Sequence, residues 1–240
     1  MPGAATLDRV LAQWTRLGVG FGGAAVRATP DLERLLLETG RHARMHSRLF
    51  IMAATWLHRY GDAVAIHRLR HLAQVELGPD HQSVLGLLLD FAQRGTHPEQ
   101  FAAVIRTLPP ATEAMPLFEI EAESSVLVAR AERRSCALGR RWNLWCHDFE
   151  FKFDALRPPN WVMARNPTLR HRIDFRGDLR ASILAALEHD DSAGASEIAL
   201  AQACGGSRAQ VRNALANLEL SCRAERSRTP GAKRTRIVAR

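Results

Sequence analysis

The chain has 240 residues, with 33 basic and 25 acidic side chains and a formal net charge of +8. This length suffices for one large domain or for a main domain with a smaller one, and no apolar run approaches the roughly 18 residues of a transmembrane helix. The first residues lack the basic start and apolar stretch of a signal peptide, so we expect a cytoplasmic protein without a membrane partner.

The first part of the chain, residues 1–110, is predicted to be an all-α domain. Apolar residues recur there at helical spacing, and the periodic segments begin at Thr, Pro or Asp and end at Gly or Pro. About six helices with short connections indicate a bundle or a short array of helical hairpins. The predicted helices cover about 6–17, 31–40, 43–60, 62–77, 80–95 and 96–108, the last of them opened by a capping box of Thr96 and Glu99.

Two patterns in this region could suggest a ligand, and we interpret neither as a site. Gly18, Gly20 and Gly23 spell G-x-G-x-x-G, but a predicted helix, not a strand, precedes them. Histidines lie four positions apart without the H-E-x-x-H pattern of a zinc enzyme. A P-loop and a G-x-S-x-G elbow are also missing from the sequence. We therefore expect no metal, no cofactor and no enzyme activity; an enzyme with an unfamiliar site among the histidines is the minor alternative.

Residues 111–175 are predicted to be a mixed region that connects to, and packs on, the helical domain. Phe149, Phe151 and Phe153 alternate with polar residues, which is the period of a β-strand. Prolines at 158, 159 and 167 indicate an ordered connector. The tryptophans at 142, 145 and 161 stand near arginines and could stack on bases, but we expect them to serve in packing, at the seam between the helical region and the winged helix.

The last part, residues 176–240, is predicted to contain three helices followed by a β-hairpin. Asp178 and Ser196 are expected to cap the first two helices, and Ser207 with Gln210 forms a capping box for the third. The buried stripe of the third helix would consist of Val211, Ala214, Leu215 and Leu218. After it, the chain is expected to form a strand, a turn at residues 229–231 and a return strand.

The stretch EIALAQACGGSRAQVRNALANLEL resembles the helix-turn-helix of bacterial repressors of the ArsR and MarR type. The resemblance covers about 64 residues and implies a winged helix-turn-helix domain, so that the whole chain would be mainly α with a helical bundle and a C-terminal winged helix. Gly206 stands where these families have an apolar residue, and we expect it to loosen the turn. The matching positions are Leu200, Ala201, Gly205, Ser207, Val211, Leu215 and Leu218.

Most of the net positive charge lies in this last part of the chain. Residues 208–240 hold nine basic and two acidic residues, which is the electrostatic pattern of a protein that binds a polyanion. The resemblance implies that the third helix enters a DNA major groove and that the hairpin meets phosphates or the minor groove. The expected DNA-binding residues are Ser207, Arg208, Gln210, Arg212, Asn213 and Asn217 on the helix and Arg226, Arg228, Lys233, Arg234 and Arg236 on the hairpin.

The sequence thus predicts a protein that binds double-stranded DNA, a bacterial transcriptional regulator. Its N-terminal domain would serve in dimerisation, ligand binding or partner binding, and paired half-sites would favour a homodimer. The alternative is a non-enzymatic interaction module or antitoxin-like subunit, whose winged helix binds a protein or binds nucleic acid without sequence preference.

Overall fold

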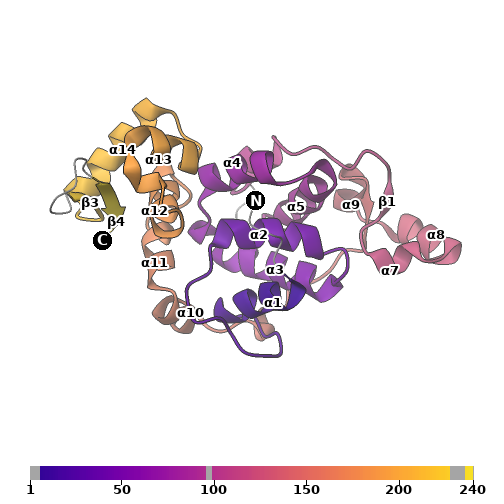
Figure 1. Cartoon of the computed structure of the whole chain (residues 1–240). Coiled ribbons are helices and arrows are strands. Elements are labelled where there is room, and N and C mark those ends of the chain that lie inside the picture. The colour runs from indigo at the N-terminus through magenta and orange to yellow at the C-terminus, as the bar shows by residue number, and fades with distance from the viewer. Residues whose placement is uncertain (1–5, 96–98, 228–235, 240) are drawn as a thin grey trace. The chain divides into compact units, whose positions relative to one another are not determined.

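The computed structural model describes residues 6–95, 99–227 and 236–239, and within these ranges the chain is mainly helical (Figure 1). Fourteen α-helices and two two-stranded sheets are found there. None of these helices combines the length and the hydropathy needed to cross a membrane. The chain folds into two compact units, one from residues 1–61 and 73–167 and the other from residues 62–72 and 168–240.

The first unit is built mostly from helices, several of them short. Asp31 caps α2, as its position before the apolar stripe predicts, and Pro79 opens α5 one residue before the predicted start. The predicted capping box of Thr96 lies outside the described residues. The helices are α1 (Leu7–Arg16), α2 (Leu32–His42), α3 (Ser47–Tyr60), α5 (Pro79–Ala92), α6 (Ala102–Ile105), α7 (Glu119–Ala122), α8 (Ser125–Arg134), α9 (Ala137–Arg141) and α10 (Pro159–Arg165).

Helix α5 forms the centre of the first unit. Every residue from Ser83 to Ala92 is buried, because the helix is apolar on all sides and packs against α2 and α3. The buried Asp90 accepts hydrogen bonds from Trp142 Nε1 and Arg141 Nη1, both at 2.9 Å. Trp142 lies over Gly86, where an added Cβ would come within 2.1 Å of the indole ring. Trp142 therefore serves in packing, and the partner shown by these contacts is α5 of the same unit; the seam with the winged helix stays a prediction.

The glycine-rich segment at residues 18–23 pairs with another part of the chain. Gly20 N–H donates to the Ala155 carbonyl at 2.9 Å, and Gly18 accepts from Arg157 N–H at 2.8 Å. Gly18 has a φ of +88°, and an added Cβ would lie 2.9 Å from Val162. These glycines thus allow close contact between two backbone segments.

The strand predicted around Phe149, Phe151 and Phe153 is wrong. The segment has no ladder partner and ends in a 3₁₀ turn (Phe153–Ala155), whereas the sheet of this unit pairs β1 (Met115–Pro116) with β2 (Leu144–Trp145) in parallel. Its aromatic rings pack on helices instead: Phe149 lies 4.6 Å from the Phe91 ring, and Phe151 stacks on His58 at 4.2 Å. Side-chain packing, not sheet formation, explains the alternation.

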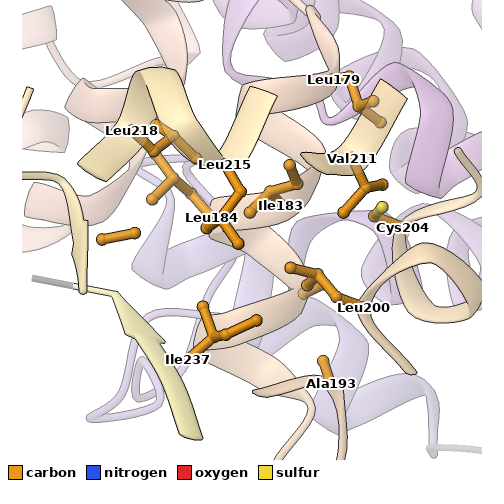
Figure 2. Packing of buried hydrophobic residues seen from close by; sticks show 12 residues of the cluster. Leu179, Ile183, Leu184, Ala193, Leu200, Cys204, Val211, Leu215, Leu218 and Ile237 are labelled. Carbon is orange, nitrogen blue, oxygen red and sulfur yellow. The ribbon is translucent and has the colours of Figure 1, made fainter. Parts of the chain in front are cut away.

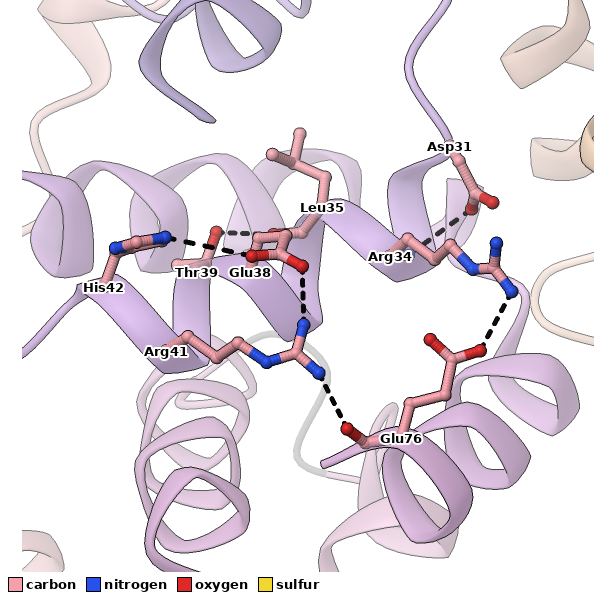
Figure 3. Close-up of polar contacts among 8 residues, drawn as sticks. All are labelled: Asp31, Arg34, Leu35, Glu38, Thr39, Arg41, His42 and Glu76. Atoms are coloured by element: carbon pink, nitrogen blue, oxygen red, sulfur yellow. Dashed lines mark hydrogen bonds and ion pairs between the residues drawn. The ribbon is translucent and has the colours of Figure 1, made fainter. Parts of the chain in front are cut away.

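Polar contacts join α2 to the end of α4 (Ile66–Glu76) within the first unit (Figure 3). Arg34 on α2 pairs with the Glu76 carboxylate at 2.9 Å, and Arg41 donates to the Glu76 carbonyl at 2.7 Å. Arg41 also pairs with Glu38 at 2.5 Å. The two arginines therefore bind the carboxylate and the backbone carbonyl of Glu76. Glu76 is the last residue of α4, and the last carbonyl groups of a helix have no partner within it.

The second unit contains three complete helices, parts of two others, a small antiparallel sheet and a 3₁₀ turn (Ala193–Ala195) between the first two complete helices. Its apolar core is formed by residues from the three complete helices, the 3₁₀ turn and both strands (Figure 2). Two helices cross the unit boundaries, α4 at Leu72 and α11 (Pro167–Ile173) at Pro167. The remaining elements are α12 (Leu179–His189), α13 (Glu197–Cys204), α14 (Arg208–Leu220), β3 (Ala224–Ser227) and β4 (Arg236–Ala239).

The sequence did not show that residues 62–72 belong with the C-terminal unit. Arg68 N–H donates a hydrogen bond to Ser182 Oγ at 3.3 Å. An added Cβ at Gly177 would lie 2.6 Å from Ile66 Cγ1, so no side chain fits there. The division into 1–110, 111–175 and 176–240 stays a prediction.

Candidate nucleic-acid interface

The turn between α13 and α14 requires glycine at its first position. Gly205 follows Cys204 with a φ of +74°, a left-handed conformation that costs other residues free energy. A Cβ at Gly205 would also lie 2.7 Å from both the His67 carbonyl oxygen and the His71 Cβ. The segment 62–72 therefore contacts this turn directly and fixes where α14 begins.

Gly206, the residue expected to loosen the turn, is closely packed. An added Cβ would lie 2.9 Å from Leu179 Cδ1 and 3.2 Å from Val211 Cγ2. The side chain of Leu179, from the start of α12, thus fills the space beside Gly206. Leu179 of α12 therefore supplies the apolar side chain that position 206 lacks.

Ser207 and Gln210 form the predicted capping box at the start of α14. Ser207 Oγ accepts from Gln210 N–H at 3.3 Å, and Gln210 Oε1 accepts from Ser207 N–H at 3.1 Å. Two of the predicted DNA-binding residues therefore already have a structural role. A bidentate contact of Gln210 with adenine would require its side chain to leave the box.

Helix α14 has one buried face and one exposed face, because its apolar residues recur three and four positions apart. Val211, Leu215 and Leu218 are fully buried in the core (Figure 2), and the predicted Ala214 is partly buried beside them. Arg208 and Arg212 stand one turn apart with about three-fifths of each side chain exposed. Asn213 and Asn217 are also exposed.

The carboxylate of Glu197, at the first position of α13, gathers three of the predicted arginines. Its oxygens lie 3.1 Å from Arg212, 3.3 Å from Arg226 and 3.7 Å from Arg208. Burial alone would raise the pKa of Glu197, but the hydrogen bonds and charges of Arg212 and Arg226 together hold it below its ordinary value. We call Glu197 and these three arginines the Glu197 cluster.

The two strands beside α14 carry the remaining described arginines. Strands β3 and β4 are antiparallel, with Arg226 opposite Ile237, and Ile237 points into the core. Arg226 also pairs with Glu219 at 2.7 Å, which ties the strand to α14. Arg236 donates to the Asp191 carbonyl at 2.6 Å and lies 3.6 Å from its carboxylate.

The structure thus brings some of the predicted residues together and separates others. Arg208, Arg212 and Arg226 converge on Glu197, whereas Arg236 binds elsewhere, at Asp191. The predicted Arg228, Lys233 and Arg234 lie outside the described residues. Glu197 was not among the predicted residues; the preference for acidic residues in the first turn of a helix was the only signal for it.

Electrostatically, this surface is basic but partly neutralised. Residues 208–227 and 236–239 contain five arginines and two glutamates. Glu197 and Asp191, from neighbouring segments, add negative charge to this surface. Exposed ion pairs contribute only about 0–1 kcal/mol each, so a phosphate could replace a carboxylate at a small cost in free energy. In the described part of the chain, no three His, Cys, Asp or Glu side chains lie close enough together to hold a metal ion.

Comparison of the chain with protein-family models, with curated proteins and with solved structures gave no match.

Proposed function

We propose that the second unit is a winged helix that binds double-stranded DNA, and that the protein is a cytoplasmic bacterial transcriptional regulator. The observation that carries this proposal is the exposed polar face of α14, with Arg208, Arg212, Asn213 and Asn217 on a capped helix beside arginine-bearing strands. Arginine and asparagine are the side chains that bind guanine and adenine bidentately in the major groove. The fixed turn at Gly205 and the apolar core of α14 would present that face rigidly.

In the proposed complex, α14 lies in the major groove and the two strands flank the phosphate backbone. Its 13 residues span about 20 Å, which is enough to reach several base pairs. Arg208 and Arg212 would contact base edges, while Arg226 and Arg236 would contact phosphates. A homodimer would place two such helices about 34 Å apart, on successive turns of DNA.

The Glu197 cluster gives this proposal a specific physical feature. Without DNA, Glu197 holds the guanidinium groups of three arginines near one another, so less conformational entropy is lost when they bind. Its negative charge also repels the phosphate backbone. Glu197 would therefore weaken sequence-independent binding more than binding to a site where the arginines gain base contacts.

The test is fluorescence anisotropy of two labelled duplexes, one with the DNA upstream of the protein's own gene and one with the same bases shuffled. We expect the upstream duplex to bind at least about a hundredfold more tightly at near-physiological salt. Arg208→Ala with Arg212→Ala should reduce this preference by at least tenfold, because each bidentate base contact is worth about 1–3 kcal/mol.

The matched control is Arg133→Ala with Arg134→Ala, which removes the same charge from exposed positions on α8 in the first unit. This variant should keep the preference for the upstream duplex. Equal binding of both duplexes by the wild-type protein would overturn sequence-specific regulation and leave a general DNA anchor. Absence of binding at low salt would overturn DNA binding altogether.

A protein-binding module is the second candidate, and two exposed apolar side chains favour it. Leu220 at the end of α14 is 86% exposed, and Ile198 on α13 is 52% exposed. Exposed apolar groups on a small unit are common at protein interfaces. Under this alternative the Arg208 and Arg212 double variant would leave partner binding intact, whereas Leu220→Ser with Ile198→Ser would weaken it.

A further inference from the structure

Two cysteines of the first unit, ten positions apart, are adjacent in the fold. Cys136 stands directly before α9, and its backbone N–H donates to the carbonyl oxygen of Cys146 at 2.9 Å. Cys146 directly follows β2. Gly139 lies between the two segments, and a Cβ there would be 2.7 Å from the Leu144 carbonyl oxygen. This close packing holds the backbones of the two cysteines together.

The two thiols have different surroundings. Cys146 is buried, with 3% of its surface exposed, whereas Cys136 is partly exposed. Cys136 Sγ accepts a hydrogen bond from Gly139 N–H at 3.4 Å. The neighbouring Cys146 thiol, helped by Gly139, lowers the pKa of Cys136 to about 6 despite partial burial. The interaction with Cys136, together with burial, raises the pKa of Cys146.

We propose that Cys136 and Cys146 are a redox-active dithiol, in which Cys136 is the site of modification by a hydroperoxide and Cys146 resolves it into a disulfide. The proposal rests on the adjacent backbones of the two cysteines and on the partial exposure of Cys136 beside the buried Cys146. The inference is independent of DNA binding.

The chemistry needs a hydroperoxide as the oxidant. The Cys136 thiolate attacks one peroxide oxygen, the S–O bond forms and the O–O bond breaks, and the leaving oxygen takes a proton to give water or an alcohol. The Cys136 sulfur becomes a sulfenic acid, oxidised by two electrons. The Cys146 sulfur then attacks the Cys136 sulfur and expels hydroxide, which takes the Cys146 proton and leaves as water.

The other two cysteines provide internal controls. Cys204 is fully buried in the second unit, and burial raises the pKa of its thiol to about 11. Cys222 is exposed, and its nearest cysteine in sequence is Cys204. If exposure alone determined oxidation, Cys222 would react first; if the neighbouring Cys146 determines it, Cys136 reacts first.

The experiment treats the full-length protein with stoichiometric hydrogen peroxide and maps the products by mass spectrometry. We expect a disulfide between Cys136 and Cys146 that dithiothreitol reverses, and a higher melting temperature for the oxidised protein. Cys222→Ser should behave as the wild type. In Cys146→Ala, which keeps the buried position apolar, Cys136 should accumulate sulfenic acid that dimedone traps.

Two results would overturn the proposal. One is oxidation of Cys222 before Cys136, and the other is failure of the wild-type protein to form the disulfide. Alkylation of Cys136 by iodoacetamide supplies a second measurement on the wild-type protein. Its rate should reach half of the maximum near pH 6, and a midpoint at the ordinary pKa of a thiol would contradict the assigned role of Cys146.

Discussion

Gly205 is constrained both by its backbone conformation and by its neighbours. Its φ is +74°, and any Cβ would collide with the carbonyl of His67. We therefore expect Gly205→Ala to lower the free energy of unfolding of the second unit by about 3 kcal/mol, from the left-handed conformation and overpacking together. Thermal unfolding followed by circular dichroism measures the change.

The control for this variant is Gly22→Ala. Gly22 has an ordinary φ, and nothing lies within 4 Å of an added Cβ. Its melting temperature should change little, because neither strain nor a clash is introduced. A Gly205→Ala protein as stable as this control would mean that the turn relaxes and that His67 does not fix it.

Glu197 is the residue whose removal should strengthen sequence-independent DNA binding. Glu197→Gln keeps the size of the side chain but removes the charge that now neutralises parts of Arg208, Arg212 and Arg226. We expect tighter binding of the shuffled duplex and a salt dependence steeper by about one unit of slope, as for one added phosphate contact. Anisotropy titrations at several salt concentrations measure both.

The matched control for Glu197→Gln is Glu132→Gln, an exposed carboxylate on α8 of the first unit. Both variants change the net charge equally, so a general charge effect would appear in both. If the two variants bind the shuffled duplex alike, Glu197 has no local effect on the arginines.

At the scale of the element, α14 depends on the reciprocal cap at its start. Ser207→Ala removes the acceptor for Gln210 N–H and should lower the free energy of unfolding by about 1 kcal/mol. Ser207→Asp supplies another acceptor at the same helix terminus and should retain most of the stability. Urea unfolding of the two variants gives the comparison, and equal losses in both would mean that the hydroxyl does more than cap the helix.

The starts of the helices in the second unit could be predicted from sequence because a cap is a local interaction. Asp178, Ser196 and Ser207 each accept a hydrogen bond from a residue two or three positions later. The buried stripe of α14 follows from a period of 3.6 residues in the same way. Short-range geometry determines these features, so neighbouring residues suffice to predict them.

The strand predicted at Phe149, Phe151 and Phe153 failed because alternation records which side chains are buried, not what buries them. Here the rings pack on α3 and α5. The contacts of Glu197 with Arg226, of Cys136 with Cys146 and of Gly205 with His67 were likewise not predictable. Each joins residues of different segments, at positions that only the tertiary fold determines.

At the scale of the whole molecule, the second unit is assembled from two separate parts of the chain. Residues 62–72 supply the His67 carbonyl beside Gly205, the Ile66 side chain beside Gly177 and the Arg68 N–H beside Ser182. A unit built this way depends on a segment that lies within the sequence of the first unit. A fragment chosen from sequence alone, starting near residue 168, would lack all of these contacts.

We therefore expect the isolated fragment 168–240 to be less stable than the same residues in the full chain. Hydrogen exchange of the α12–α14 amides compares the two, and exchange should be faster in the fragment because its turn at Gly205 has lost the contact with His67. A synthetic peptide of residues 62–76, added at a concentration about a hundred times its Kd, should raise the free energy of unfolding of the fragment by about 2.7 kcal/mol. A scrambled peptide should not. A fragment that is fully protected without the peptide would show that α12, α13, α14 and the two strands are sufficient, and that residues 62–72 only rest on a unit that already folds.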